Sequence, residues 1–225
     1  MAKNKLQRFE EMKSMPHVFE PTMEEIKNQG VDYKNNWNKN VFKNDHPITL
    51  ELGCGKGEYT IGLAKKYPER NFIGVDIKGA RMWVGAKQAS EENLKNVAFL
   101  RTKVDFIDAL FGKNEVDEIW LTFSDPQPNK PNKRLTSKMF INRYKNIVKP
   151  GAIIHLKTDS DVLFESTEEE IKNNNYTNHF LTWDLYNTIE KLPKNIHDIL
   201  HIKTHYEELF TARGFKIKYC QFSIS

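Results

Sequence analysis

The sequence of 225 residues is long enough for one domain with a modest extension. Hydrophobic residues make up 39% of it, enough for a packed core, and aromatic residues at 12% exclude a disordered chain. No apolar run approaches the ~18 residues of a membrane span, and we expect no secretory signal because no apolar segment follows the first residues. The two cysteines, Cys54 and Cys220, exclude a disulfide framework and suit a reducing cytoplasm.

The formal net charge of +4 is concentrated in one part of the chain. The charged residues between Pro126 and Lys149 are all basic, whereas the rest of the chain holds 27 basic and 30 acidic residues. This basic stretch comprises Lys130, Lys133, Arg134, Lys138, Arg143, Lys145 and Lys149. A solvated helix face is one explanation of such a run. Clustered charge of one sign, however, favours an anionic partner whose phosphates the basic side chains neutralise.

The hydrophobic pattern divides the chain into an arm and an alternating α/β body. Residues 1–46 have weak periodicity and are expected to form a partly ordered N-terminal arm, whereas residues 47–225 form the main domain. The predicted strands cover 48–52, 71–76, 96–100, 117–123, 152–158, 179–186 and 215–224. The predicted helices cover 58–67, a stretch after residue 76, 138–148, 161–172 and 206–212. This alternation predicts a parallel sheet with ligands at the carboxyl ends of its strands, and the last two strands can form an antiparallel edge.

The most informative local motif is the segment ELGCGKG (51–57) at the end of the first predicted strand. Its glycines, Gly53, Gly55 and Gly57, allow a tight turn and the close approach of a ligand. Asp76 ends the next strand, where a carboxylate accepts hydrogen bonds from both hydroxyls of a ribose. This order of strand, turn, helix, strand and acid predicts a cofactor that contains a nucleoside.

Two cofactors fit this unit, and a glycine-rich turn that binds nothing is a third explanation. A dinucleotide site has the order G-x-G-x-x-G, which requires glycine at position 58, and Glu58 stands there. Glu51 lies two residues before the first glycine. This order favours S-adenosylmethionine, because its ammonium group needs an acceptor and it has no pyrophosphate to bind.

The loop after the fourth predicted strand, SDPQP (124–128), is the candidate catalytic segment. Two prolines in three residues stiffen this loop, so Asp125 is held where substrate meets cofactor. Methyltransferases for exocyclic amines have an N/D-P-P-aromatic motif here, whose aromatic residue stacks on the target base. Gln127 and Pro128 occupy its last two positions and weaken that interpretation, and a simple turn aspartate is the alternative role of Asp125.

Taken together, these motifs resemble the bacterial tRNA (guanine-N(7)-)-methyltransferase family over nearly the whole chain. The segments that carry the resemblance are YKNNW (33–37), VFKND (41–45), ELGCGKGEYT (51–60), NFIGVDIK (71–78), SDP (124–126), HLKTD (155–159) and THYEELF (204–210). The resemblance implies a Rossmann-like seven-stranded S-adenosylmethionine-dependent methyltransferase fold, mostly parallel, with helices on both faces. It also implies a cytoplasmic enzyme that methylates nitrogen 7 of a variable-loop guanosine in tRNA (conventional tRNA position 46).

The resemblance and the basic stretch together assign roles to individual residues. Asp125 is the expected catalytic residue, between cofactor and base. The expected cofactor contacts are Glu51, Gly53, Gly55, Gly57, Asp76, Lys103 and Asp125. The expected substrate contacts are Asn129, Lys130, Lys133, Arg134, Asp159, Thr204, His205, Tyr206 and Glu207.

The chain departs from the family pattern at three points. Gln127 replaces the usual tryptophan, and the shorter basic segment after it places Asn129 where the family has a substrate-contacting lysine. Lys103 stands where an acid usually meets adenine, which leaves that contact to the Lys103 backbone or to Asp105. Two alternatives therefore stay open: a methyltransferase for another RNA or a small molecule, and an RNA-binding module with a degraded cofactor site.

Methylation of guanine nitrogen 7 requires alignment rather than proton removal, because this atom has a free lone pair. We therefore expect Asp125 to orient the reactants and stabilise the positive charge that moves to the base, while Asp159 and Glu207 accept hydrogen bonds from guanine. This chemistry needs no metal. His197 and His201 have the spacing of a two-histidine zinc helix, but aspartate stands where metalloproteases have glutamate. A monomer and a homodimer are both compatible with the sequence.

Overall fold

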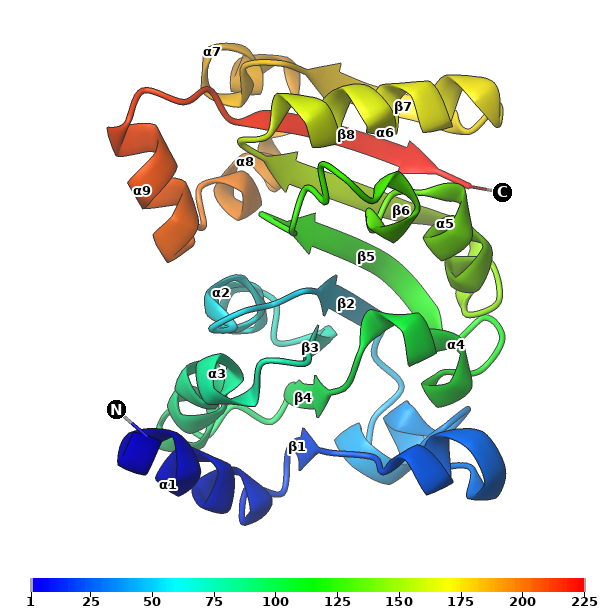
Figure 1. Cartoon of the computed structure of the whole chain (residues 1–225), viewed down its shortest axis with the longest axis vertical. Helices are drawn as coiled ribbons and strands as arrows, with labels where there is room; N and C mark the ends of the chain where they lie inside the picture. Colours follow the sequence, from blue (N-terminus) through cyan, green and yellow to red (C-terminus); the bar gives the residue numbers. More distant parts are fainter. Residues whose placement is uncertain (1, 225) are drawn as a thin grey trace.

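A computed structural model describes residues 2–224, and they form one mixed β-sheet with helices on both faces (Figure 1). Its eight strands are β1 (Val18–Phe19), β2 (Ile48–Leu52), β3 (Asn71–Asp76), β4 (Val97–Arg101), β5 (Val116–Thr122), β6 (Val148–Thr158), β7 (Thr177–Thr182) and β8 (Lys218–Ser223). Their order in the sheet is β1-β4-β3-β2-β5-β6-β8-β7. The first six strands in this order are parallel to one another, and β8 is antiparallel to both β6 and β7. The predicted parallel sheet with an antiparallel edge is confirmed, with β1 as one strand more than the seven expected.

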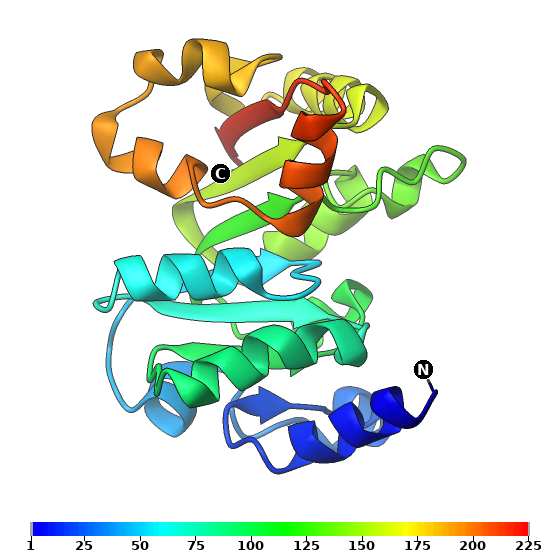
Figure 2. The same cartoon turned by 90° about the vertical axis from the view of Figure 1, so that its left-hand side faces the viewer.

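The α-helices cover the sheet in two layers (Figures 1 and 2). They are α1 (Ala2–Lys13), α2 (Glu58–Lys66), α3 (Gly79–Glu91), α4 (Ile107–Leu110), α5 (Lys138–Tyr144), α6 (Asp161–Asn173), α7 (Leu185–Thr188), α8 (Lys194–Leu200) and α9 (His205–Ala212). Two π-helical turns, η1 (Glu25–Gln29) and η2 (Trp37–Phe42), lie in the arm, and three short 3-10 turns are η3 (Val104–Phe106), η4 (Pro131–Lys133) and η5 (Ile189–Lys191). Side chains of α4, α5 and α6 pack on one face, and those of α1, α2, α3, α7 and α8 pack on the other.

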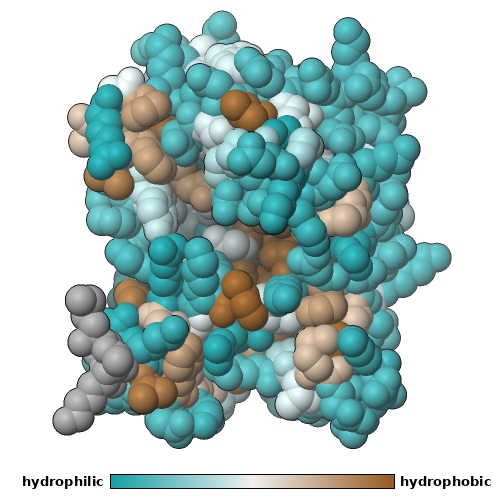
Figure 3. Space-filling view, viewed as in Figure 1, coloured by the Kyte–Doolittle hydropathy of each residue, from teal (hydrophilic) through white to brown (hydrophobic). Residues whose placement is uncertain are grey.

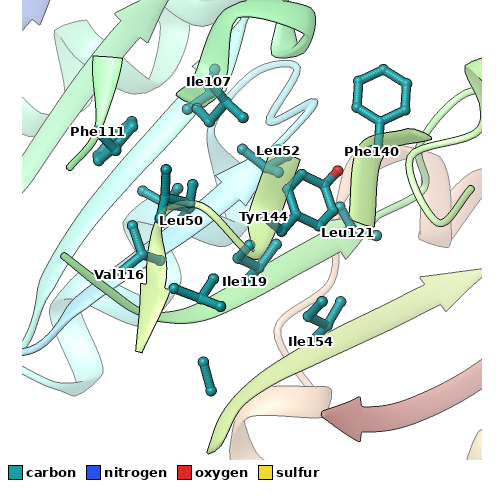
Figure 4. Close-up of a cluster of buried hydrophobic side chains, with 14 of the residues drawn as sticks. Leu50, Leu52, Ile107, Phe111, Val116, Ile119, Leu121, Phe140, Tyr144 and Ile154 are labelled. Atoms are coloured by element: carbon teal, nitrogen blue, oxygen red, sulfur yellow. The ribbon is translucent and has the colours of Figure 1, made fainter. Parts of the chain in front are cut away.

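The hydrophobic core follows from alternation along the central strands. Leu50 and Leu52 of β2 point to the same face as Ile119 and Leu121 of β5, and Tyr144 of α5 covers them (Figure 4). All of these side chains are almost completely buried. Burial of each large apolar side chain contributes roughly 1.5–3 kcal/mol to folding. The two central strands are therefore firmly held, and their carboxyl ends provide a rigid edge for a site.

The arm contributes to this core as well as to the sheet. Val18 of β1 pairs with Phe99 of β4, so the arm supplies the edge strand at one end of the sheet (Figure 1). Tyr33 and Trp37 are buried, and the Trp37 ring stacks on Phe111 with ring centroids 5.0 Å apart. The division of the chain at residue 46 stays a prediction, and the residues before it share a continuous core with those after it.

Two of the predicted elements end earlier in the structure than expected. The helix predicted over 138–148 ends at Tyr144, and β6 begins at Val148 and continues through Pro150 and Gly151. The strand predicted over 179–186 ends at Thr182, because the Thr182 hydroxyl accepts a hydrogen bond from the Asp184 backbone and turns the chain into α7. The cause in each case is a local turn that hydrophobic periodicity does not reveal.

Candidate active site

The glycine-rich turn after β2 brings its backbone close to the neighbouring strand. The amides of Gly53 and Cys54 both donate hydrogen bonds to the Val75 carbonyl, at 2.8 and 3.1 Å. Gly57 has a φ of 73°, and a Cβ at this position would lie 2.6 Å from the Phe99 ring. Any larger residue at 57 would therefore clash and strain the backbone. Gly57 serves to pack the start of α2 on the sheet, and it does not line the cavity described below.

Glu51 is the buried carboxylate at the end of β2, with only 3% of its surface exposed. The Thr60 amide donates a hydrogen bond to its Oε2 atom at 2.8 Å, and the hydroxyls of Thr60 and Thr122 donate further hydrogen bonds to its two oxygens. Burial raises the pKa of Glu51 to about 7, although these hydrogen bonds favour the charged form. A cation that enters the site would meet a partly desolvated carboxylate, which is the acceptor expected for an ammonium group.

The Glu51 carboxyl should make the stability of the unliganded protein depend on pH. Its pKa is about 7 in the folded state and near 4.5 when unfolded, so the folded state holds an extra proton between these values. Stability therefore falls as pH rises from about 4.5 to 7, by up to roughly 3 kcal/mol from this group. Urea unfolding across this range checks the slope, with Glu51→Gln as the control that has no such carboxyl. Identical pH slopes for the two proteins would contradict the assignment.

Asp76 ends β3 opposite the glycine turn and faces the same space. One carboxylate oxygen accepts a hydrogen bond from the Gly55 amide at 2.9 Å, and the other accepts one from the Lys78 amide at 2.7 Å. These two bonds fix the orientation of the carboxylate and leave further lone pairs for ligand hydroxyls. The turn and the acid are therefore brought together as predicted.

A cavity of about 560 Å³ lies at the carboxyl ends of β2, β3, β4 and β5. Ten of the predicted site residues line it: Glu51, Gly53, Gly55, Asp76, Lys103, Asp125, Lys130, Lys133, Thr204 and Tyr206. The surface of the molecule is largely hydrophilic in the view of Figure 3, with a hollow between its upper and lower parts. The cavity is large enough for a small nucleoside cofactor together with part of a substrate.

Asp125 is an exposed side chain on the loop that follows β5, and it lines the cavity. Its Oδ1 atom accepts a hydrogen bond from the Gln127 amide at 3.0 Å. Phe123 and Gln127 on either side both adopt positive φ angles, 50° and 45°, which are uncommon for residues other than glycine. The loop is therefore held in a specific shape that turns a carboxylate toward the cavity.

Arg134 is buried and contacts the backbone of the loop that carries Asp125. Only 8% of Arg134 is exposed, and its Nε atom donates a hydrogen bond to the Pro126 carbonyl at 3.0 Å. The expected contact between Arg134 and substrate therefore has no support in this arrangement. Arg134 instead positions the loop that carries Asp125. The exposed Asn129 lies on the same loop and does not line the cavity.

Glu207 is also placed away from the cavity, in a fully buried ion pair. Neither Glu207 nor Lys157 is exposed, and their charged atoms lie 2.8 Å apart. The Tyr186 hydroxyl donates a hydrogen bond to the same carboxylate. Glu207 consequently exposes no surface for contact with a guanine base in this structure, and its predicted contact with guanine stays a prediction. Lys157 also donates hydrogen bonds to the Leu200 and Ile202 carbonyls, at 2.6 and 3.3 Å.

Four further predicted substrate contacts, Asp159, Thr204, His205 and Tyr206, differ in whether they line the cavity. Thr204 caps α9, where its hydroxyl accepts a hydrogen bond from the Glu207 amide at 3.2 Å. The His205 amide donates to Glu58 at 2.9 Å, and its side chain is exposed. Asp159 does not line the cavity, and burial raises its pKa. Thr204 and Tyr206 are thus the members of this group that the structure brings to the cavity.

The structure reveals that the basic stretch is partly neutralised in three dimensions. Lys133 pairs with Asp105 at 2.7 Å, Arg143 with Asp108 at 3.1 Å, and Lys149 with Asp117 at 2.6 Å. The acidic partners lie outside the stretch, so the sequence run alone overstates the local positive charge. Lys130 lines the cavity and forms no ion pair with the part of the chain that the structure describes.

Two contributors to the site were missed by sequence reasoning. Thr122 at the end of β5 holds Glu51, and its polar side chain at the carboxyl end of a buried strand was the available signal. Arg81 of α3 lines the cavity, and its guanidinium lies 5.8 Å from the centroid of the Tyr206 ring. No local pattern joins Arg81 to a residue so far along the chain, so only the fold reveals this contact.

Neither a metal centre nor a membrane segment is found in residues 2–224. Within this range, no group of three or more histidine, cysteine, aspartate or glutamate side chains is arranged to hold a metal ion. The rings of His197 and His201 contact the carbonyls of Leu192 and His197, at 2.6 and 2.7 Å. Over the same residues, no helix is both long enough and apolar enough to cross a membrane.

Comparison with known proteins places this chain among methyltransferases. Residues 45–220 match a family model described as "Putative methyltransferase". A tRNA (guanine-N(7)-)-methyltransferase from Bacteroides thetaiotaomicron is 50% identical over 224 residues, which cover 100% of this chain and 87% of that protein. One from Christiangramia forsetii is 46% identical over 225 residues and covers 99% of each. The solved 16S rRNA methyltransferase KamB shares the fold, with a TM-score of 0.64, 14% identity, and coverage of 87% of this chain and 95% of that one.

Proposed function

The chain belongs to the tRNA (guanine-N(7)-)-methyltransferase family, and we propose that it transfers a methyl group from S-adenosylmethionine to nitrogen 7 of a variable-loop guanosine in tRNA. The observation that carries this proposal is the cavity in which Glu51, Asp76 and Asp125 meet. In this cavity Glu51 is the acceptor for an ammonium group and Asp76 is the acceptor for the hydroxyls of a ribose. Asp125 is the carboxylate beside the substrate. That set suits a cationic nucleoside cofactor and an enzyme that acts on a polar base.

The residues present fit S-adenosylmethionine on the basis of their chemistry. Glu51 is a buried carboxylate whose burial opposes its own ionisation, so a cationic group beside it gains a strong partner. The backbone of Gly53 and Gly55 lines the cavity without side chains, and Asp76 is oriented by two backbone amides. When bound, this cofactor supplies a methyl group on a positively charged sulfur.

The role of Asp125 follows from the charge that develops on the base. Nitrogen 7 of guanine uses a free lone pair in the attack and has no proton to release. Positive charge therefore appears on the ring of the base, and a carboxylate beside it stabilises this charge electrostatically. Asp125 lies on a loop fixed by the Gln127 amide and by Arg134, so its position costs no reorganisation during the reaction. Alignment of the reactants supplies the remainder of the acceleration.

The proposed setting is the cytoplasm, where tRNA is the partner and no metal takes part in the reaction. Both cysteines are free and buried, which is compatible with a reducing compartment. A monomer is one assembly compatible with the proposal. A homodimer is the other assembly compatible with the proposal.

The decisive experiment is incubation of the protein with bulk tRNA and labelled S-adenosylmethionine, followed by nucleoside analysis. We expect label in 7-methylguanosine. A tRNA transcript with adenosine in place of the variable-loop guanosine serves as the matched control and should stay unlabelled. Label in another nucleoside, or in a small molecule, would contradict the proposed substrate. Absence of saturable binding of S-adenosylhomocysteine would instead indicate an RNA-binding module without a working cofactor site.

A further inference from the structure

A second cavity adjoins the cofactor cavity and takes its walls from both the arm and the main domain. Its volume is about 500 Å³, and Ile26 and Lys27 of η1 form its arm side. Lys103, Asp105 and Lys133 line both cavities. Because Lys133 and Asp105 are joined by an ion pair of 2.7 Å, they form a shared wall between the two spaces.

The side chains of this second cavity leave an excess of positive charge. Its cations are Lys27, Lys103, Lys133 and Arg143, and its carboxylates are Asp105 and Asp108. Both carboxylates are already paired, Asp105 with Lys133 and Asp108 with Arg143. Lys27 and Lys103 are exposed and form no ion pair with any of the residues from 2 to 224. Two ammonium groups in one cavity therefore lack a counter-charge from the protein.

We propose that this cavity binds a backbone phosphate of the substrate RNA, with Lys27 and Lys103 as its ligands. The inference rests on the proposed function. An RNA strand that delivers a base to Asp125 must pass over the rim of the cofactor cavity, and Lys103 and Lys133 stand on that rim. A phosphodiester supplies the missing negative charge there, and contacts of this kind position a nucleic acid without reading its sequence.

The rest of the lining supports a phosphate and sugar rather than a base edge. Ile26, Phe106 and Ala109 offer apolar surface. A lysine ammonium is a point charge that suits phosphate oxygens, whereas recognition of a base edge requires several fixed donors and acceptors. Binding of a phosphate also explains a lysine at position 103, where the family usually has an acid. The arm then becomes part of the RNA-binding surface through Lys27.

Lys27→Ala is the cleanest test, because Lys27 lines only the second cavity. The dissociation constant for tRNA should be measured by filter binding at several KCl concentrations, beside that for S-adenosylhomocysteine. We expect weaker tRNA binding and a slope of log K against log salt that is smaller by about one. Cofactor affinity should not change. Lys103→Ala should give the same change in slope, and Lys172→Ala, an exposed lysine of α6, should give none.

Two outcomes would overturn the assignment. Wild-type tRNA affinity and slope in both Lys27→Ala and Lys103→Ala would show that no phosphate is held here. If the slope changes but guanosine monophosphate competes with tRNA in a Lys27-dependent manner at micromolar concentration, the site belongs to a free nucleotide and not to RNA. The proposed function fails separately, through lack of 7-methylguanosine in the wild-type reaction. That failure would leave the Lys27-dependent slope of RNA binding measurable.

Discussion

Replacement of Asp125 by alanine is expected to lower kcat for tRNA methylation by roughly 10²–10³-fold, the cost of removing one preorganised electrostatic contact in an active site. The reason is that Asp125 lines the cavity, where the proposed function places it beside the charge that develops on the base. Affinity for S-adenosylhomocysteine should change far less, because Glu51 and Asp76 supply the acceptors for that ligand. Single-turnover rates and equilibrium titration measure the two effects separately.

The matched control for this experiment is Asp32→Ala. Asp32 is an exposed aspartate of the arm that lines neither cavity, so its loss should leave turnover unchanged. Asp125→Asn adds a further distinction, because asparagine keeps a hydrogen-bond acceptor for the Gln127 amide and removes the charge. If Asp125→Asn has near-normal turnover while Asp125→Ala does not, orientation is the main role. Near-normal turnover in both variants would exclude Asp125 from the chemistry.

Lys157→Met is expected to lower the free energy of unfolding by about 3–5 kcal/mol, the usual cost of removing one partner from a buried ion pair. The variant leaves Glu207 fully buried beside an apolar side chain. It also removes the hydrogen bonds to the Leu200 and Ile202 carbonyls, which hold the segment before α9. Urea unfolding at pH 7 measures the loss.

A second variant separates the ion pair from simple packing. Lys157→Met combined with Glu207→Gln removes both charges and should recover a large part of the lost stability. Lys149→Met is the control, because Lys149 pairs with Asp117 at an exposed position and such pairs contribute roughly 0–1 kcal/mol. If the double variant is no more stable than Lys157→Met, the unpaired Glu207 charge is not the source of the loss.

The positions and parallel direction of the central strands could be predicted from the sequence because the signal there is local. Leu50 and Leu52 alternate with residues of the opposite face, and the glycine turn marks the end of their strand. The same locality explains why Glu51, Asp76 and Asp125 could be predicted to lie together, and all three line one cavity. Each follows a strand, and parallel strands bring their carboxyl ends to one edge.

Local patterns reveal least where distant residues decide how a side chain is placed. Glu207 belongs to a specific segment of the family, but Lys157 and Tyr186 hold it inside the protein. The basic stretch is uninterrupted in the sequence, yet Asp105 and other acids from elsewhere pair with several of its members. The weak periodicity of residues 1–46 likewise gave no sign that Trp37 would be completely buried. Pairing across the fold has no local pattern, so it cannot be predicted from one sequence.

The connection between the last two strands has a consequence for how new specificity can arise. β7 and β8 are antiparallel neighbours, so residues 183–217, including Thr204 and Tyr206, form one large excursion whose ends are fixed side by side. Within its surface turns, doubling the length of a flexible loop costs only about 0.6 kcal/mol in closure entropy. Insertions in this excursion, placed away from the Lys157 contacts, would therefore leave the sheet intact. Natural variation or directed evolution can reshape the substrate side of the cavity here at little cost to folding, while the cofactor side stays unchanged.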